Sequence, residues 1–181
     1  DEITRFIELA KEVGIKKAMF STIHALTAEQ NIVDGSSPGG HSTDLRRARG
    51  GINNIIPTTS GAAQTVAKAI PELKGLFDGM AIRVPVACGS LVDFTFVTSR
   101  PTSVGEINEI FKKAAQNPRW KGILAVTDEP LVSTDIIGRS ESAIVDLPLT
   151  RVEDGDLVKV LAWYDNEWGY ANRLIEQTIA V

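Results

Sequence analysis

The chain of 181 residues has a single cysteine, so it forms no internal disulfide, and this scarcity favours a reducing compartment such as the cytoplasm. No apolar run approaches the roughly 18 residues of a membrane span, and the first residues do not follow the pattern of a signal peptide. The net charge of −4 argues against generic nucleic-acid binding. We therefore expect neither a membrane nor a nucleic acid as a partner, and we assign no metal site.

What is present is ordinary for a globular domain, with 43% apolar and 23% charged residues. The length suffices for one domain with a core and is too short for two large ones, so we expect a single domain over 1–181. A small anionic ligand stays compatible with the acidic balance, because local arginines decide such binding.

The spacing of apolar residues predicts four helices and six strands. Ser103 and Glu106 form the pattern of a capping box at the start of one helix. The polar, glycine-containing segment 28–54 reads as a long loop, which in a compact domain is usually functional or disordered. Clustered strands without regular βαβ alternation indicate an α+β fold. The expected helices are 3–13, 61–70, 103–116 and 171–179, and the expected strands are 15–26, 80–86, 91–98, 123–126, 142–147 and 157–164.

Several polar residues suggest chemistry, although each has a structural interpretation. His24 ends a predicted strand facing the long loop, yet a lone histidine is more often held by structural hydrogen bonds. Three arginines within 46–49 are typical of a solvated face. Arg83, inside an apolar strand, needs a carboxylate or an anionic ligand. Residues 58–61 open a helix with hydroxyls and a glycine, which suits either a phosphate site or a cap without ligand.

Three separated segments, residues 21–27, 55–63 and 163–170, carry a family resemblance. In this order they resemble the catalytic half of phosphorylating glyceraldehyde-3-phosphate dehydrogenases, and the likeness runs from about Gly14 to the C-terminus. The resemblance implies a largely antiparallel or mixed sheet with helices packed on one face. It also implies a homotetramer in the complete enzyme, with glyceraldehyde 3-phosphate and inorganic phosphate as ligands.

The resemblance assigns two phosphate sites. Thr27 and Arg83 resemble the residues that hold the C3 phosphate of the substrate. Arg47, Ser60 and Gly61 resemble those that hold the inorganic phosphate attacking the thioester. Ser60 stands where threonine is usual and keeps the hydroxyl, whereas the loop at 35–43 is longer than its counterpart.

The resemblance also assigns catalytic and cofactor roles. His24 resembles the base that pairs with a cysteine thiolate, and this nucleophile would fall a few residues before Asp1. Cys88 receives no catalytic role and reads as structural. Asn166 resembles the residue that binds the nicotinamide carboxamide, and Tyr170 packs close to that ring. We expect NAD or NADP in the complete enzyme and none on this chain alone, which has no glycine-rich dinucleotide motif.

The function implied is the oxidation of glyceraldehyde 3-phosphate, with NAD and phosphate, to 1,3-bisphosphoglycerate through a cysteine thioester. We expect the isolated chain to be inactive. An erythrose-4-phosphate dehydrogenase domain is an alternative that shares the scaffold. A non-catalytic module that binds phosphate or mediates oligomerisation is a second alternative.

Overall fold

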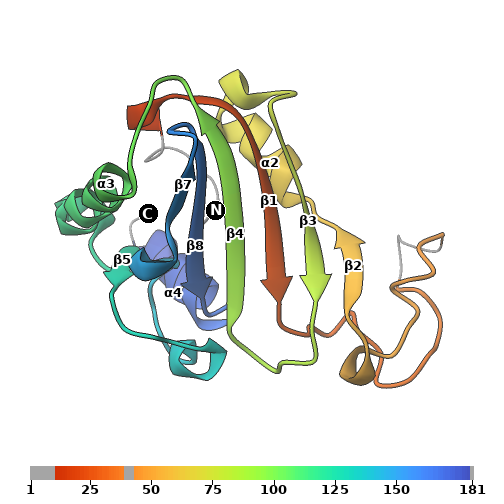
Figure 1. The fold of residues 1–181 in the computed structure, drawn as a ribbon. Helices are drawn as coiled ribbons and strands as arrows, with labels where there is room; N and C mark the ends of the chain where they lie inside the picture. The colour runs from red at the N-terminus through yellow and green to blue at the C-terminus, as the bar shows by residue number, and fades with distance from the viewer. Residues whose placement is uncertain (1–10, 39–42, 180–181) are drawn as a thin grey trace.

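The computed structural model describes residues 11–38 and 43–179 (Figure 1). Its strands are β1 Ile15–His24, β2 Ile56–Thr59, β3 Phe77–Arg83, β4 Ser90–Thr98, β5 Leu124–Thr127, β6 Ala143–Asp146, β7 Arg151–Glu153 and β8 Leu157–Tyr164. Its α-helices are α2 Ala62–Ala69, α3 Val104–Gln116 and α4 Trp168–Ile179. Short 3-10 helices are η1 Lys11–Val13, η2 Gly51–Asn53, η3 Pro71–Leu73, η4 Pro118–Trp120, η5 Ser133–Ile136 and η6 Leu147–Leu149.

One mixed sheet holds all eight described strands in the order β2-β3-β1-β4-β8-β6-β5, with β7 paired to β8. β1 pairs with β3 in parallel, as β5 does with β6, and the other pairs are antiparallel. The expected α+β fold with a mixed sheet is thereby confirmed.

The core lies on one face of this sheet. Along β4 every second side chain is buried, because successive residues of a strand point to opposite faces. Phe94 and Phe96 on this strand are each 1% exposed, and Phe20 of β1 joins the same core. Helices α2 and α3 add Val66 and Phe111 to it, so both helices cover the same face.

A close approach between β1 and β3 requires a glycine. A Cβ atom built on Gly79 would lie 2.2 Å from the ring of Phe20, which is nearly fully buried. Any side chain at position 79 would therefore push this ring out of the core.

The opposite face of the sheet is partly exposed in the described chain and carries both apolar and polar residues. Met19 on β1 is 59% exposed and Met80 on β3 is 45% exposed. We call this surface the outer face. It comprises the alternate residues Met19, Ser21, Ile23, Met80, Ile82, Leu91, Asp93, Thr95, Val97, Lys159, Leu161 and Trp163.

Helix α3 begins as expected but is capped differently in one respect. Ser103 Oγ accepts a hydrogen bond from the backbone N–H of Glu106, which confirms the N-cap. The Glu106 carboxylate does not return to the cap. It pairs with Arg100 and accepts a bond from Thr102, so the expected capping box is half formed.

Some expected boundaries were wrong. The strand expected at 80–86 is β3, which begins and ends three residues earlier. β2 and β7 were missed because strands of four and three residues carry little periodic pattern. The last helix begins at Trp168, ahead of the expected 171, because Asp165 caps it. Of the helix expected at 3–13, residues 3–10 lie outside the described chain, and Lys11–Val13 form a 3-10 turn.

In the described part of the chain, every helix falls short of the length and apolar content of a membrane span.

Candidate active site

Strand direction brings the sequence-predicted residues to one edge of the sheet. β1, β3 and β8 end at this edge, while β2 and β4 begin there. His24 is paired with Arg83 in the β1–β3 register. Ser90 is paired with Tyr164 in the β4–β8 register. Figure 1 shows these strand ends side by side, and the side chains of Thr22 and Tyr164, 142 positions apart in the sequence, are in contact there.

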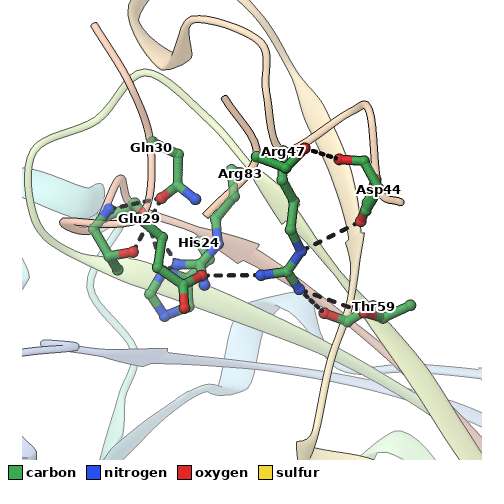
Figure 2. A network of polar contacts seen from close by, with 10 residues as sticks. His24, Glu29, Gln30, Asp44, Arg47, Thr59 and Arg83 are labelled. Atoms are coloured by element: carbon green, nitrogen blue, oxygen red, sulfur yellow. Dashed lines mark hydrogen bonds and ion pairs between the residues drawn. The ribbon is translucent and has the colours of Figure 1, made fainter. Parts of the chain in front are cut away.

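The imidazole of His24 has two neighbours at the same nitrogen. Its Nδ1 lies 2.7 Å from Ala25 O and 2.5 Å from Arg83 Nη1 (Figure 2). The contact with the carbonyl requires a proton on Nδ1, because a carbonyl only accepts. The contact with the guanidinium requires a lone pair on Nδ1, because a guanidinium only donates. We place the proton on Nδ1. The Arg83 proton then goes to Ala25 O, 3.1 Å away, whereas an Nδ1 lone pair would face the carbonyl lone pairs. This leaves the Nε2 lone pair available to act as a base.

The pKa of His24 is lowered from its ordinary value of 6.5. Burial is the main cause and the charge of Arg83 adds to it, while the bond to Ala25 and the charge of Glu167 oppose it. The ring is therefore neutral at pH 7, which is the form that a general base requires.

Arg83 is a half-buried cation without a carboxylate partner among residues 11–38 and 43–179. Its Nη1 contacts His24 and Ala25 O, and its Nε is buried with no hydrogen-bond partner in the same part of the chain. Burial lowers its pKa, although the guanidinium keeps its charge at neutral pH. A desolvated guanidinium with an unused donor is a binding group for an anion.

Arg47 is 7% exposed and fully engaged within the chain (Figure 2). Its Nη1 lies 2.9 Å from Glu29 Oε2 and its Nε lies 3.3 Å from Asp44 Oδ2. Its Nη2 donates to Thr59 O at 3.1 Å, next to the predicted phosphate residue Ser60. Glu29 is the more exposed of the two carboxylates, at 48% against 28% for Asp44.

The other predicted phosphate residues have local partners. The N–H and hydroxyl of Thr27 both donate to Gln30 Oε1, at 2.8 and 3.1 Å. Ser60 Oγ accepts a bond from Ala62 N at 3.2 Å, and a Cβ atom added at Gly61 would find no atom within 4 Å. Among the described residues no hydrogen bond or ion pair joins Ser60 or Gly61 to the edge that holds His24.

Asn166 lies just beyond β8. The oxygen end of its side-chain amide is fixed by hydrogen bonds, and the nitrogen end is available to a ligand. Its Oδ1 accepts from Gly89 N at 3.2 Å and from Ser90 Oγ at 3.0 Å. Its Nδ2 has one long contact, 3.5 Å to Glu167 Oε1. Tyr170 follows in the first turn of α4 and is 66% exposed.

Asp165 anchors the loop that carries Asn166. This carboxylate is 2% exposed, and it accepts bonds from Glu167 N, Trp168 N and Gly138 N, each at 2.8 Å. Burial raises its pKa, but these N–H donors outweigh burial and hold the pKa below its usual value. Asp165 thus caps the start of α4 and also holds the loop that contains Gly138.

Cys88 donates from Sγ to Asp165 Oδ1 at 3.2 Å. Burial, followed by the bond to and the charge of this carboxylate, raises the pKa of the thiol. A raised pKa disfavours the thiolate, which is the reactive form. The geometry therefore agrees with the structural interpretation of Cys88.

Sequence reasoning missed three residues of this edge. Tyr164 OH lies 2.5 Å from Thr22 Oγ1, and its ring stands edge-on to His24 with centroids 6.0 Å apart. Ser90 contacts Asn166, and Glu29 contacts Arg47. The position of Tyr164 as the last residue of a predicted strand could have identified it as a candidate site residue. A serine at the start of a strand gives no comparable sign in the sequence.

Within residues 11–38 and 43–179 no three side chains of His, Cys, Asp or Glu are placed to hold a metal ion.

Comparison with known proteins shows which family this chain belongs to. The family model for the C-terminal domain of glyceraldehyde 3-phosphate dehydrogenase matches residues 3–166. Glyceraldehyde-3-phosphate dehydrogenase 2 of Streptomyces arenae is 51% identical over 164 residues, which are 91% of this chain and 47% of that protein. The enzymes of Zymomonas mobilis and Mycobacterium tuberculosis are 48% and 49% identical over 168 residues, covering 93% of this chain and 48% of each relative.

The chain thus spans about half the length of the curated relatives that it matches. The family match covers most of the chain and contains His24, Arg83 and Asn166. The chain belongs to the family of glyceraldehyde 3-phosphate dehydrogenase C-terminal domains, and so to an oxidoreductase family.

Proposed function

We propose that this chain is the catalytic part of a cytoplasmic enzyme that oxidises glyceraldehyde 3-phosphate, with NAD and phosphate, to 1,3-bisphosphoglycerate. The observation that carries the proposal is the contact between His24 and Arg83. A neutral base and a desolvated cation without a carboxylate partner, in the described chain, stand side by side at the sheet edge. Their chemistries match the two ends of a phosphorylated aldehyde.

His24 acts as the base through Nε2. It accepts the hydroxyl proton of the thiohemiacetal that forms when a thiolate attacks the aldehyde carbon. The Nδ1–H bond to Ala25 O holds the ring in the required tautomer and stabilises the imidazolium after transfer. Arg83 holds the C3 phosphate of the same substrate, with Thr27 beside it on the loop after β1.

The second phosphate binds at Arg47, with the hydroxyl of Ser60 and the N–H of Gly61 at the start of α2. It takes the place of Glu29, which is the more exposed of the two carboxylates on Arg47. From there a phosphate oxygen attacks the thioester carbon, the carbon–sulfur bond breaks, and the acyl phosphate leaves.

The residues present fit a nicotinamide cofactor. The Oδ1 atom of Asn166 is occupied by Gly89 and Ser90, so Nδ2 faces outward and can donate to the carboxamide oxygen. Tyr170 is exposed in the first turn of α4, four residues after Asn166, and offers an aromatic surface to the nicotinamide ring. When bound, the nicotinamide supplies a hydride acceptor; the chain's own contribution is to orient it and to exclude water.

The nucleophile of this reaction is a cysteine outside the chain, because Cys88 has a raised pKa and is bonded to Asp165. The same observation is what favours the alternative of a non-catalytic phosphate-binding or assembly module. An erythrose-4-phosphate dehydrogenase is the other alternative, since a single base and an anion site serve either aldehyde.

A second copy of the chain is the proposed partner on the outer face. Ile82, Ile23, Leu91 and Trp163 form one apolar row across the four central strands, and the exposed side chains of Met19 and Met80 lie on the same face. Contiguous exposed apolar surface of this kind marks protein–protein contacts. This face supports the homo-oligomer that the resemblance implies.

A chimera tests the proposed function. We expect this chain, joined behind the preceding half of the Streptomyces arenae relative, to form NADH only with both aldehyde and phosphate present. Replacing His24 with Asn should lower kcat by about 10²–10⁴-fold, because general-base catalysis contributes that much. Comparing kcat/KM for glyceraldehyde 3-phosphate and erythrose 4-phosphate separates the two enzymes. Turnover by residues 1–181 alone, lost in Cys88→Ser, would contradict the assignment of the nucleophile.

Ligand linkage tests the anion sites. Phosphate at about ten times its Kd should stabilise the chain by about 1.4 kcal/mol, measured as a rise in Tm at constant ionic strength. The variant Arg83→Ala should show a smaller rise. Arg151→Ala is the matched control, because this exposed arginine donates to the carbonyls of Pro148 and Thr150. Equal rises in all three proteins would show a general salt effect and remove the site.

The neutral His24 predicts a pH dependence of stability. The folded chain binds a proton at His24 more weakly than the unfolded chain, whose histidine keeps the ordinary pKa of 6.5. Acidification through 6.5 therefore favours the unfolded state, and this stabilising contribution returns as the pH rises. Urea unfolding between pH 7.5 and 5.5 should show a smaller loss of stability in His24→Gln than in wild type. The same loss in both would refute a buried, neutral ring.

The outer face predicts self-association. Sedimentation should show a concentration-dependent oligomer, and Met19→Lys should shift it toward monomer by placing a charge in the interface. Val132→Lys, on an exposed valine outside the sheet, serves as the control. A monomer at every concentration, or dissociation by both variants alike, would rule out this interface.

A further inference from the structure

Ser90 is a buried hydroxyl between the two functional strand ends. It is 1% exposed and begins β4, the strand that separates β1 from β8. On one side the chain leaves β1 through His24 and Ala25. On the other side it leaves β8 through Tyr164 toward Asn166. The Ser90 side chain hydrogen-bonds to both segments.

The direction of each bond at Ser90 is fixed by its partners. The backbone N–H of Ala25 can only donate, so Ser90 Oγ accepts at 3.1 Å. The hydroxyl proton is then left for Asn166 Oδ1, at 3.0 Å. Gly89 N, which also only donates, meets the same Oδ1 at 3.2 Å and settles which end of the amide it is.

These bonds reach both functional groups. Ala25 is fully buried, and its carbonyl receives the bonds of His24 Nδ1 and Arg83 Nη1. Fixing the N–H of Ala25 therefore fixes the residue whose carbonyl sets the tautomer of the base. The same hydroxyl holds Oδ1 of Asn166 inward, which turns Nδ2 outward.

We propose that Ser90 is a positioning residue that holds the His24 imidazole and the Asn166 amide in a fixed mutual orientation. The inference rests on the proposed function, which gives these two groups their roles as base and cofactor contact. Ser90 itself touches no substrate, because it is buried beneath both groups. Its contribution is preorganisation, since a misplacement of about 1 Å at a reacting group costs about 100-fold in rate.

A buried hydroxyl with a purely structural role is the competing explanation, and the chain offers a matched control. Ser142 is 2% exposed, and its Oγ has no hydrogen-bond partner in the described chain. Ser142→Ala removes a buried hydroxyl without breaking any bond toward His24 or Asn166. Ser90→Ala removes one that holds both.

The test is NMR of the ¹⁵N-labelled chain in a His41→Gln background, in which His24 is the remaining histidine. Long-range ¹H–¹⁵N spectra at pH 8 should show His24 with its proton on Nδ1. In Ser90→Ala a mixture with the Nε2–H tautomer should appear, the His24 pKa should fall, and the side-chain amide resonances of Asn166 should shift. Ser90→Thr, which keeps the hydroxyl, should restore all three signals.

Ser142→Ala should leave all three signals at their wild-type positions. Ser90→Cys, of similar volume with weaker bonds, should change them in the same direction as Ser90→Ala and by less, and it serves if the alanine variant does not fold. If the His24 tautomer and pKa were unchanged in both Ser90→Ala and Ser90→Cys, the proposal would be overturned. Changes in Ser142→Ala as large as those in Ser90→Ala would also overturn it. None of these signals needs turnover, so an inactive chimera would contradict the proposed function and leave this result standing.

Discussion

The pairing of β1 with β3 in parallel and with β4 in antiparallel fixes where His24 and Arg83 lie. Because β8 is antiparallel to β4, it runs in the direction of β1, and three strands deliver their last residues to one edge. His24, Arg83 and Asn166 need no long flexible loop to meet. Each stands at, or two residues beyond, a strand end, where the hydrogen-bonded ladder holds its backbone in place.

Charge is handled differently at the two arginines of this edge. Arg47 is paired with Glu29 and Asp44, so its buried charge is compensated without a ligand. Arg83 contacts a neutral imidazole and a carbonyl and forms no ion pair in the described chain, although the charge of Glu29 acts on it from further away. Under the proposed function, Arg83 can therefore bind phosphate directly, whereas Arg47 has to exchange an internal carboxylate for it.

Elements with a strong repeating pattern were predictable from the sequence, and those created by pairing were not. The alternation of buried residues along β4 and the apolar face of α3 can both be recognised in the sequence. β3 was displaced because Asp78 and Gly79 interrupt its pattern, and the need for glycine there comes from the ring of Phe20. At the site, residue type drew attention to His24 and Arg83, and the family resemblance gave them their proposed roles. Ser90 and Glu29 were missed, because their importance lies in which distant strand they face.

The order of the strands in the sheet also bears on how the chain folds. β1 pairs with one strand about 60 positions later in the sequence and with another about 70 positions later. β8 pairs with β4 over a similar separation. Closing loops of this length is entropically unfavourable until the ladder forms. The reactive edge needs the ends of β1, β3 and β8 together, so a partly folded chain in which one of these strands is unpaired lacks the complete site.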